Sequence, residues 1–197
     1  GLILWPGSKR SVKDGAEAKR ICDEARAGGA RSVGVFVSEC AAEVVAVCEA
    51  AGADLAQLHG DGARAALPEL LSARERGEHQ LGLVYVVSAR EDGSVVTEMP
   101  SDEQAAQLEY LLVDGVNPGS GESFDWDAFE PPRAASLTRG GWLLAGGLAP
   151  SNVATAASSA RPDGVDVASG TADDSGVRKD HEKVRAFVDN ARAAVAA

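Results

Sequence analysis

The chain has 197 residues, which is enough for one domain with a substantial core. Lysine and arginine total 19 and aspartate and glutamate total 30, so the formal net charge is −11. That charge argues against a nucleic-acid partner and against an anionic membrane surface, because both attract clustered cations. A small phosphorylated substrate is not excluded, since a local group of donors can bind an anion on an acidic protein.

The composition is that of a globular protein, with 45% apolar and 25% charged residues. The longest apolar runs, near Leu81–Val87 and Trp142–Ala149, are far shorter than the roughly 20 residues that span a bilayer. Cys22, Cys40 and Cys48 form no C-x-x-C pair. We therefore expect reduced thiols, with no disulfide and no zinc site, in the cytoplasm, or in a plastid if the source is a photosynthetic eukaryote.

Short apolar runs recur along the chain, and most are continuously apolar, which is typical of strands buried on both faces. The expected strands are Gly1–Trp5, Ser32–Val37, Leu55–Leu58, Leu81–Val87, Tyr110–Val113, Trp142–Ala145 and Val165–Val167. Segments of helical length lie between them. The expected helices are Asp14–Arg26, Ala41–Ala51, Ala63–Arg76, one behind the capping box of Ser101 and Gln104, one starting near Pro150, and Lys179–Ala196.

Strands that alternate with helices predict right-handed parallel βαβ units. Two α/β architectures compete: an open doubly wound sheet, and an eight-fold barrel whose first unit is missing. No G-x-G-x-x-G follows the first expected strand, so a dinucleotide-binding fold gains no support. No linker or shift in composition divides the chain, which predicts a single domain over residues 1–197.

Polar residues gather where strands end, which is where active sites form in parallel α/β folds. Asp114 ends an apolar strand, and burial there would raise its pKa and suit a general acid; a turn-capping role is equally compatible. Arg10 follows the first strand and can grip a carboxylate at two points, or lie solvated in a loop.

Histidine and glutamine side chains offer weaker signals. His59 can titrate near neutrality or serve as a hydrogen-bonded structural residue. Gln57 points towards the mouth of a barrel or packs against its neighbours. Asp166 lies at the rim, in the last expected strand. His79 and His181 are interpreted as surface residues.

Small residues follow the last two expected strands. Gly146 and Gly147 come after one strand, and Ser169 and Gly170 come after the next. Glycines at these positions let backbone N–H groups approach an anion, and in barrels these loops commonly cradle a phosphate. Tight turns without a ligand are the alternative. Gly119–Gly121 is expected to belong to a mobile lid or a flexible connector.

Eight segments occur in an order and spacing that together resemble one known family. They are Ser8–Arg10, Val33–Val37, Gln57–Gly60, Leu112–Asp114, Gly119–Gly121 with Phe124–Trp126, Ala145–Leu148 with Pro150–Val153, Val165–Val167 with Ser169–Gly170, and Lys179–Asp180. The family is phosphoribosylanthranilate isomerase, an enzyme of tryptophan biosynthesis. The resemblance covers nearly the whole chain and implies a (β/α)8 TIM barrel. It also implies an isomerase that performs an Amadori rearrangement on a phosphorylated aminosugar, with no metal or redox cofactor.

The resemblance also implies roles for individual residues. Asp114 matches the general acid, and Arg10 matches the residue that grips the substrate near the anthranilate carboxylate. Two further groups follow by position. The phosphate loops correspond to Gly146, Gly147, Ser169 and Gly170, and further substrate contacts to Gln57, His59 and Asp166.

One element of the family has no counterpart in the chain. The family's general base is a cysteine in a Lys-Ile-Cys-Gly-like motif at the end of the first strand, and Gly1 aligns with the start of the second strand. We therefore expect a barrel that lacks its first βα unit, cut from a longer isomerase or fused behind another tryptophan-pathway domain. The alternative is a non-catalytic, phosphate-ligand-binding barrel. A third hypothesis is another phosphate-binding barrel enzyme, such as indole-glycerol-phosphate synthase or a sugar-phosphate epimerase.

Overall fold

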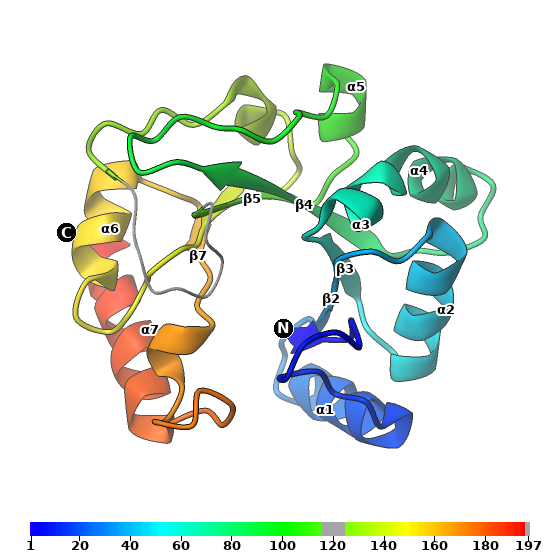
Figure 1. Cartoon of the computed structure of the whole chain (residues 1–197), viewed down its shortest axis with the longest axis horizontal. Helices are drawn as coiled ribbons and strands as arrows, with labels where there is room; N and C mark the ends of the chain where they lie inside the picture. Colours follow the sequence, from blue (N-terminus) through cyan, green and yellow to red (C-terminus); the bar gives the residue numbers. More distant parts are fainter. Residues whose placement is uncertain (116–124, 196–197) are drawn as a thin grey trace. The chain divides into compact units, whose positions relative to one another are not determined.

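The computed structural model describes residues 1–115 and 125–195 (Figure 1). The predicted lid or connector at Gly119–Gly121 lies outside the described residues. The chain forms two compact units. The first contains Gly1–Val86 and Ala106–Glu109, and the second contains Val87–Ala105 and Tyr110–Ala197.

The first unit is a parallel sheet whose strand order follows the chain, from β1 to β4. Its strands are β1 (Leu2–Ile3), β2 (Val33–Phe36), β3 (Leu55–Leu58) and the first part of β4 (Gly82–Ala89). Its helices are α1 (Gly15–Ala27), α2 (Ala41–Ala51), α3 (Asp61–Ala65) and α4 (Leu67–Glu75). Every residue of β3 is buried, including the polar Gln57. Helices α1 and α2 pack side by side (Figure 1).

The second unit continues with parallel strands β5 (Tyr110–Gly115), β6 (Trp142–Leu144) and β7 (Gly164–Val165), again in chain order. Its helices are α5 (Asp102–Ala105), α6 (Val153–Ala160) and α7 (His181–Val195), with short 3-10 turns η1 (Arg133–Ser136) and η2 (Ser169–Thr171). Helices α6 and α7 pack against each other (Figure 1). The capping box of Ser101 and Gln104 is confirmed, with reciprocal bonds of 3.0 and 3.2 Å.

The structure corrects two expectations in the first unit. The single helix expected over Ala63–Arg76 is two helices, α3 and α4, because Pro68 has no N–H and its ring would clash with the carbonyl of Arg64 in a continuous helix. His79 is not a surface residue, since it is only 5% exposed. Its imidazole contacts the carbonyl of Leu70 at 2.9 Å and accepts the N–H of Leu81 at 3.2 Å.

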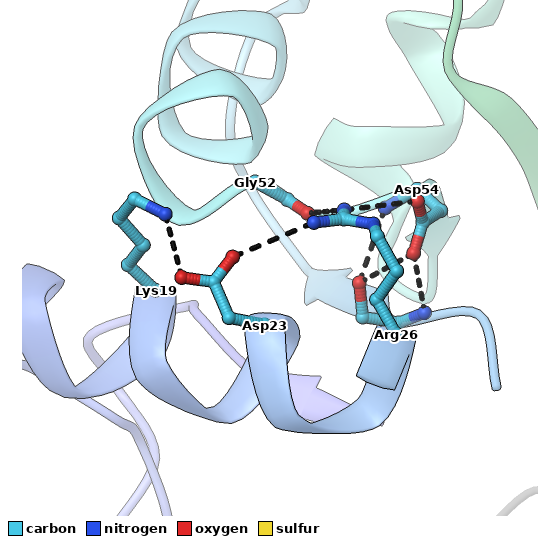
Figure 2. A network of polar contacts seen from close by, with 6 residues as sticks. Lys19, Asp23, Arg26, Gly52 and Asp54 are labelled. Carbon is cyan, nitrogen blue, oxygen red and sulfur yellow. Dashed lines mark hydrogen bonds and ion pairs between the residues drawn. The ribbon is translucent and has the colours of Figure 1, made fainter. Parts of the chain in front are cut away.

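A polar network joins α1 to the amino-terminal ends of β2 and β3 (Figure 2). Asp54 accepts hydrogen bonds from the N–H of Ser32 at 2.7 Å and from its hydroxyl at 2.8 Å. Arg26 donates to Asp54 at 3.1 Å and to the carbonyl of Gly52 at 2.7 Å. Burial alone would raise the pKa of Asp54, but the bonds from Ser32 and Arg26 outweigh it and leave the pKa lowered.

We predict that Asp54→Asn lowers stability at neutral pH by on the order of 1 kcal/mol, or roughly 2–4 °C in Tm, because amide and guanidinium donors lose a charged acceptor. A lowered folded-state pKa means that the contribution of Asp54 is complete above the unfolded pKa of about 4 and is lost as pH falls through the folded value. Thermal melts at pH 7 and at pH 3 measure this. The control is Glu49→Gln, which removes an exposed carboxylate of α2. An equal Asp54→Asn deficit at both pH values would contradict the prediction.

Candidate functional site

In the first unit, Arg10 lies in the loop that follows β1. The loop is folded back on itself, since the N–H of Arg10 donates to the hydroxyl of Ser8 at 3.1 Å. The indole N–H of Trp5 donates to Ser38 at 3.1 Å, which ties this loop to the one after β2. Arg10 is half-buried, and among the described residues its guanidinium has no hydrogen-bond or ion-pair partner. The loop is thus fixed, and the guanidinium of Arg10 is available to an anionic ligand.

Gln57 and His59 come together at the carboxyl end of β3. Gln57 is 9% exposed. Its amide nitrogen lies 3.4 Å from Nδ1 of His59. The backbone of His59 is fixed in turn, because its N–H donates to the carbonyl of Phe36 at 2.8 Å. The structure thus pairs two side chains that the sequence analysis treated separately.

In the second unit, Asp114 ends β5 with a carboxyl group that is only 8% exposed. Burial raises its pKa to about 6, and the negative charge of Asp166 adds to the rise, while a 2.8 Å hydrogen bond from the N–H of Gly115 opposes it. A carboxyl with this pKa holds its proton at mildly acidic pH and releases it near neutrality. It can therefore act as a proton donor under conditions where an exposed aspartate cannot.

A glycine is required beside this carboxyl. Gly146, which follows β6, has φ of 85°, a conformation that L side chains rarely adopt. A Cβ on Gly146 would lie 2.7 Å from the nitrogen of Gly115 and 3.1 Å from Oδ1 of Asp114. The close approach of the β6 loop to Asp114 therefore depends on the missing side chain.

Backbone donors gather after β6 and β7, two strands paired in parallel. Among the residues that the structure describes, no acceptor is found for the backbone N–H groups of Gly146, Gly147, Ser169 and Gly170. The two loops touch, because a Cβ on Gly170 would lie 2.0 Å from the carbonyl oxygen of Leu148. Unpaired amides in glycine-rich loops form an anion-binding arrangement.

Two side chains in segments that carry the family resemblance, but to which the sequence assigned no role, hold these loops. Asn152 donates to the carbonyl of Gly147 at 2.9 Å and accepts from the N–H of Ala149 at 2.8 Å. The ammonium of Lys179 donates to the carbonyl of Ala168 at 2.6 Å and to the hydroxyl of Thr171 at 3.1 Å. Asn152 and Lys179 belong to the quoted segments Pro150–Val153 and Lys179–Asp180, but these loop contacts required the structure.

None of the three cysteines lies in a described strand. Cys22 and Cys48 are fully buried in α1 and α2, and burial, with smaller contributions from Cys22 and Glu49, raises the pKa of Cys48 to about 12. Cys40 is exposed and caps α2. Within residues 1–115 and 125–195, no group of three His, Cys, Asp or Glu side chains could hold a metal ion. No described helix is long and apolar enough to cross a membrane.

A surface pocket of about 380 Å³ opens at the other end of β6, near Gly141 and Trp142. Pro131, Pro132 and Asp163 are among its lining residues. None of the expected site residues lines it, and it lies at the amino-terminal end of its strand.

The parallel α/β fold, with polar residues at the carboxyl ends of its strands, is that of the TIM-barrel class. The sequence model of N-(5'phosphoribosyl)anthranilate (PRA) isomerase matches residues 1–190, and the chain belongs to this family. It is 40% identical over 188 residues to the chloroplastic N-(5'-phosphoribosyl)anthranilate isomerase 1 of Arabidopsis thaliana, covering 95% of the chain and 64% of the relative. The Chlamydia felis isomerase is 33% identical, with 98% of this chain and 85% of the relative covered.

Solved structures of the family agree with the fold. The isomerase of Thermotoga maritima matches with a TM-score of 0.73 at 29% identity, covering 98% of this chain and 87% of that one. A structure in complex with reduced 1-(o-carboxyphenylamino)-1-deoxyribulose 5-phosphate matches with a TM-score of 0.70 at 28% identity, over 98% and 86% of the two chains. The predicted α/β TIM-barrel class is confirmed, and the open doubly wound sheet is wrong. The single domain over 1–197 stays a prediction.

We predict that Gly146→Ala destabilises the protein more than Gly52→Ala does. Both glycines have positive φ, so both substitutions carry a conformational cost of roughly 1–2 kcal/mol. A Cβ at Gly52 meets nothing within 4 Å, whereas at Gly146 it meets the backbone of Gly115 at 2.7 Å. Urea unfolding of the two variants isolates the cost of that contact. Equal losses would mean that the β6 loop has room for a side chain.

We also predict that Asp114→Asn stabilises the protein at pH 8, by on the order of 1–3 kcal/mol. Because the folded pKa of Asp114 is raised to about 6, ionisation in the folded state costs stability as pH rises from about 4 to about 6, and the cost is constant above that range. Asparagine cannot ionise and can still accept from Gly115. Urea unfolding at pH 8 and pH 4.5, with the exposed Asp127→Asn as control, measures the difference. A gain that does not grow with pH would contradict it.

Proposed function

We propose that the protein catalyses the Amadori rearrangement of N-(5'-phosphoribosyl)anthranilate to the corresponding carboxyphenylamino-deoxyribulose phosphate, a step of tryptophan biosynthesis. Membership of the isomerase family supports the substrate class. The chain spans 64% of the length of the Arabidopsis relative it matches. The observation that carries the proposal is the buried carboxyl of Asp114, with a pKa raised to about 6 at the end of β5.

In the proposed reaction, Asp114 is the general acid. Its proton goes to the furanose ring oxygen, the bond from that oxygen to C1′ breaks, and the anilino nitrogen supplies the electron pair that forms the Schiff base. A base then removes the C2′ proton, and the resulting enolamine tautomerises to the ketone. We assign the base to none of Cys22, Cys40 and Cys48, because two are buried in helices and the third caps α2.

Binding of the phosphate is proposed for the unpaired amides of the loops after β6 and β7. Four backbone donors without acceptors can supply the local positive potential that a chain of charge −11 lacks. The analogue named for one solved relative carries both a carboxyl and a 5-phosphate group. We propose that these are the two anionic ends that the protein must bind.

The remaining substrate contacts are proposed residue by residue. Arg10 binds the anthranilate carboxylate, which matches its half-buried and unpaired guanidinium among the described residues. Gln57 and His59 offer hydrogen-bonding groups at the end of β3. Asp166 contacts the substrate and sustains the raised pKa of Asp114 through its charge.

Location and fusion belong to the same proposal. We infer a cytoplasmic enzyme, or a plastid enzyme in a photosynthetic eukaryote; the two Arabidopsis relatives are named chloroplastic. Fusion behind another domain of tryptophan biosynthesis stays a prediction.

Turnover and binding together test the function. Calorimetry should show that the protein binds the reduced product analogue, and a fluorescence assay should show that it consumes phosphoribosylanthranilate. Asp114→Asn should retain binding of the analogue and lose about 10²–10⁴-fold in kcat, since general acid catalysis contributes that much. Asp127→Asn should retain both. Binding without turnover in the unaltered protein would favour the non-catalytic, phosphate-ligand-binding barrel. If the protein shows no binding and no turnover, both functions are rejected.

The pH dependence gives a second measurement of the role of Asp114. In the free protein, kcat/KM should fall on the alkaline side with an apparent pKa of about 6, because above it the acid has lost its proton. Asp166→Asn should move that pKa downwards, since the charge of Asp166 raises it. An alkaline limb that does not respond to Asp166→Asn would remove Asp114 as its source.

A further inference from the structure

The short helix α3 lies at the carboxyl ends of the strands of the first unit. The N–H of Ala63 donates to the carbonyl of Val37, just beyond β2, at 3.1 Å. A Cβ on Gly60 would lie 2.2 Å from that same carbonyl oxygen, and one on Gly62 would lie 2.8 Å from Cα of Ser38. Two glycines therefore allow α3 to sit against the end of β2 with no side chain between them.

Arg64 of α3 extends this anchoring to β3 and β4. Its Nη1 donates to the carbonyl of His59 at 2.8 Å and is 3.3 Å from the carbonyl of Val86. Leu58 pairs with Tyr85 in the sheet, so His59 and Val86 are the next residues along the two strands. The guanidinium thus bridges two neighbouring backbones just beyond the last paired residues of β3 and β4.

The arginine is itself held in place. Its side chain is 13% exposed, and its Nη2 pairs with Asp61, whose side chain is 99% exposed. Hydrogen bonds from a charged donor are stronger than neutral ones, and partial burial shields them from competing water. The peptide of His59 is consequently fixed from both sides, by Arg64 at its carbonyl and by Phe36 at its N–H.

The side chain of His59 starts from this fixed peptide and lies 3.4 Å from the amide of Gln57. Loss of the Arg64 bond would free the carbonyl of His59 to rotate. The imidazole is attached to the Cα at the start of this peptide, so a shift of the released peptide that displaces the Cα would also move the ring relative to Gln57. Arg64 can therefore control two side chains at the strand end without reaching a ligand itself.

We propose that Arg64 is a positioning residue of the isomerase site, which holds His59 and Gln57 in the orientation that receives the substrate. This inference rests on the proposed function for its kinetic consequence only. The structural part concerns the unliganded protein.

The test compares Arg64→Met with Arg74→Met. Arg74 is a matched control, because it is also an arginine of the first unit whose guanidinium donates to a backbone carbonyl, that of Gln107, at 2.9 Å. The first readout is the imidazole nitrogen NMR signal of His59 in the unliganded protein, assigned with His59→Ala. We expect Arg64→Met to shift or broaden it, and we expect Arg74→Met to leave it unchanged.

The second readout is kinetic. Arg64→Met should raise KM about tenfold and change kcat less than about twofold, as loss of substrate positioning predicts. The double variant with His59→Ala should be no worse than His59→Ala alone, because Arg64 acts through that residue. If Arg64→Met unfolds, the same measurements are made on Arg64→Lys, which keeps the aliphatic part of the side chain and its charge but loses the guanidinium.

The outcomes separate this inference from the proposed function. An unchanged His59 signal in Arg64→Met, or additive losses in the double variant, would overturn the role of Arg64. If the unaltered protein shows no turnover, the isomerase activity fails, and the His59 signal still decides whether Arg64 positions the histidine.

Discussion

Burial of the Asp114 carboxyl is the constraint around which the second unit is arranged. A charged carboxylate taken out of water is costly, so its pKa rises to about 6 and the group becomes a proton donor near neutral pH. The hydrogen bond from Gly115 and the charge of Asp166 pull that value in opposite directions. The loop after β6 can come this close only because Gly146 has no Cβ. The same property that suits the carboxyl to catalysis makes it a source of instability.

The residues after β6 and β7 and those after β3 are held in place by different kinds of contact. After β6 and β7, unpaired backbone amides provide donors, and Asn152 and Lys179 bind the carbonyls of the same loops. After β3, the donors belong to side chains, and Arg64 fixes the backbone beneath them. In an acidic protein, the unpaired amides after β6 and β7 place positive potential locally, with no need for a basic surface.

Much of the fold could be read from periodicity, and the misses have physical causes. The expected strands overlap all seven strands of the described residues. The signal was clearest for β4 and β5, which are buried on both faces over most of their length. The prediction of one helix over Ala63–Arg76 was wrong because Pro68 lacks an N–H and interrupts the helix, although the apolar pattern continues through it. The expectation that His79 lies on the surface was wrong because its imidazole packs against α4 and contacts the carbonyl of Leu70, which no local pattern encodes.

The sequence by itself determined the parallel α/β class, the family, and the candidate residues at the strand ends, because these depend on residue type and order along the chain. Only the tertiary structure decided which of those residues touch. The burial that raises the pKa of Asp114, the pairing of Gln57 with His59, and the bridge from Arg64 to two strands all depend on distances across the fold. Arg64 was invisible beforehand, since an arginine in a charged helix resembles any solvated cation until the carbonyls it binds are brought to it.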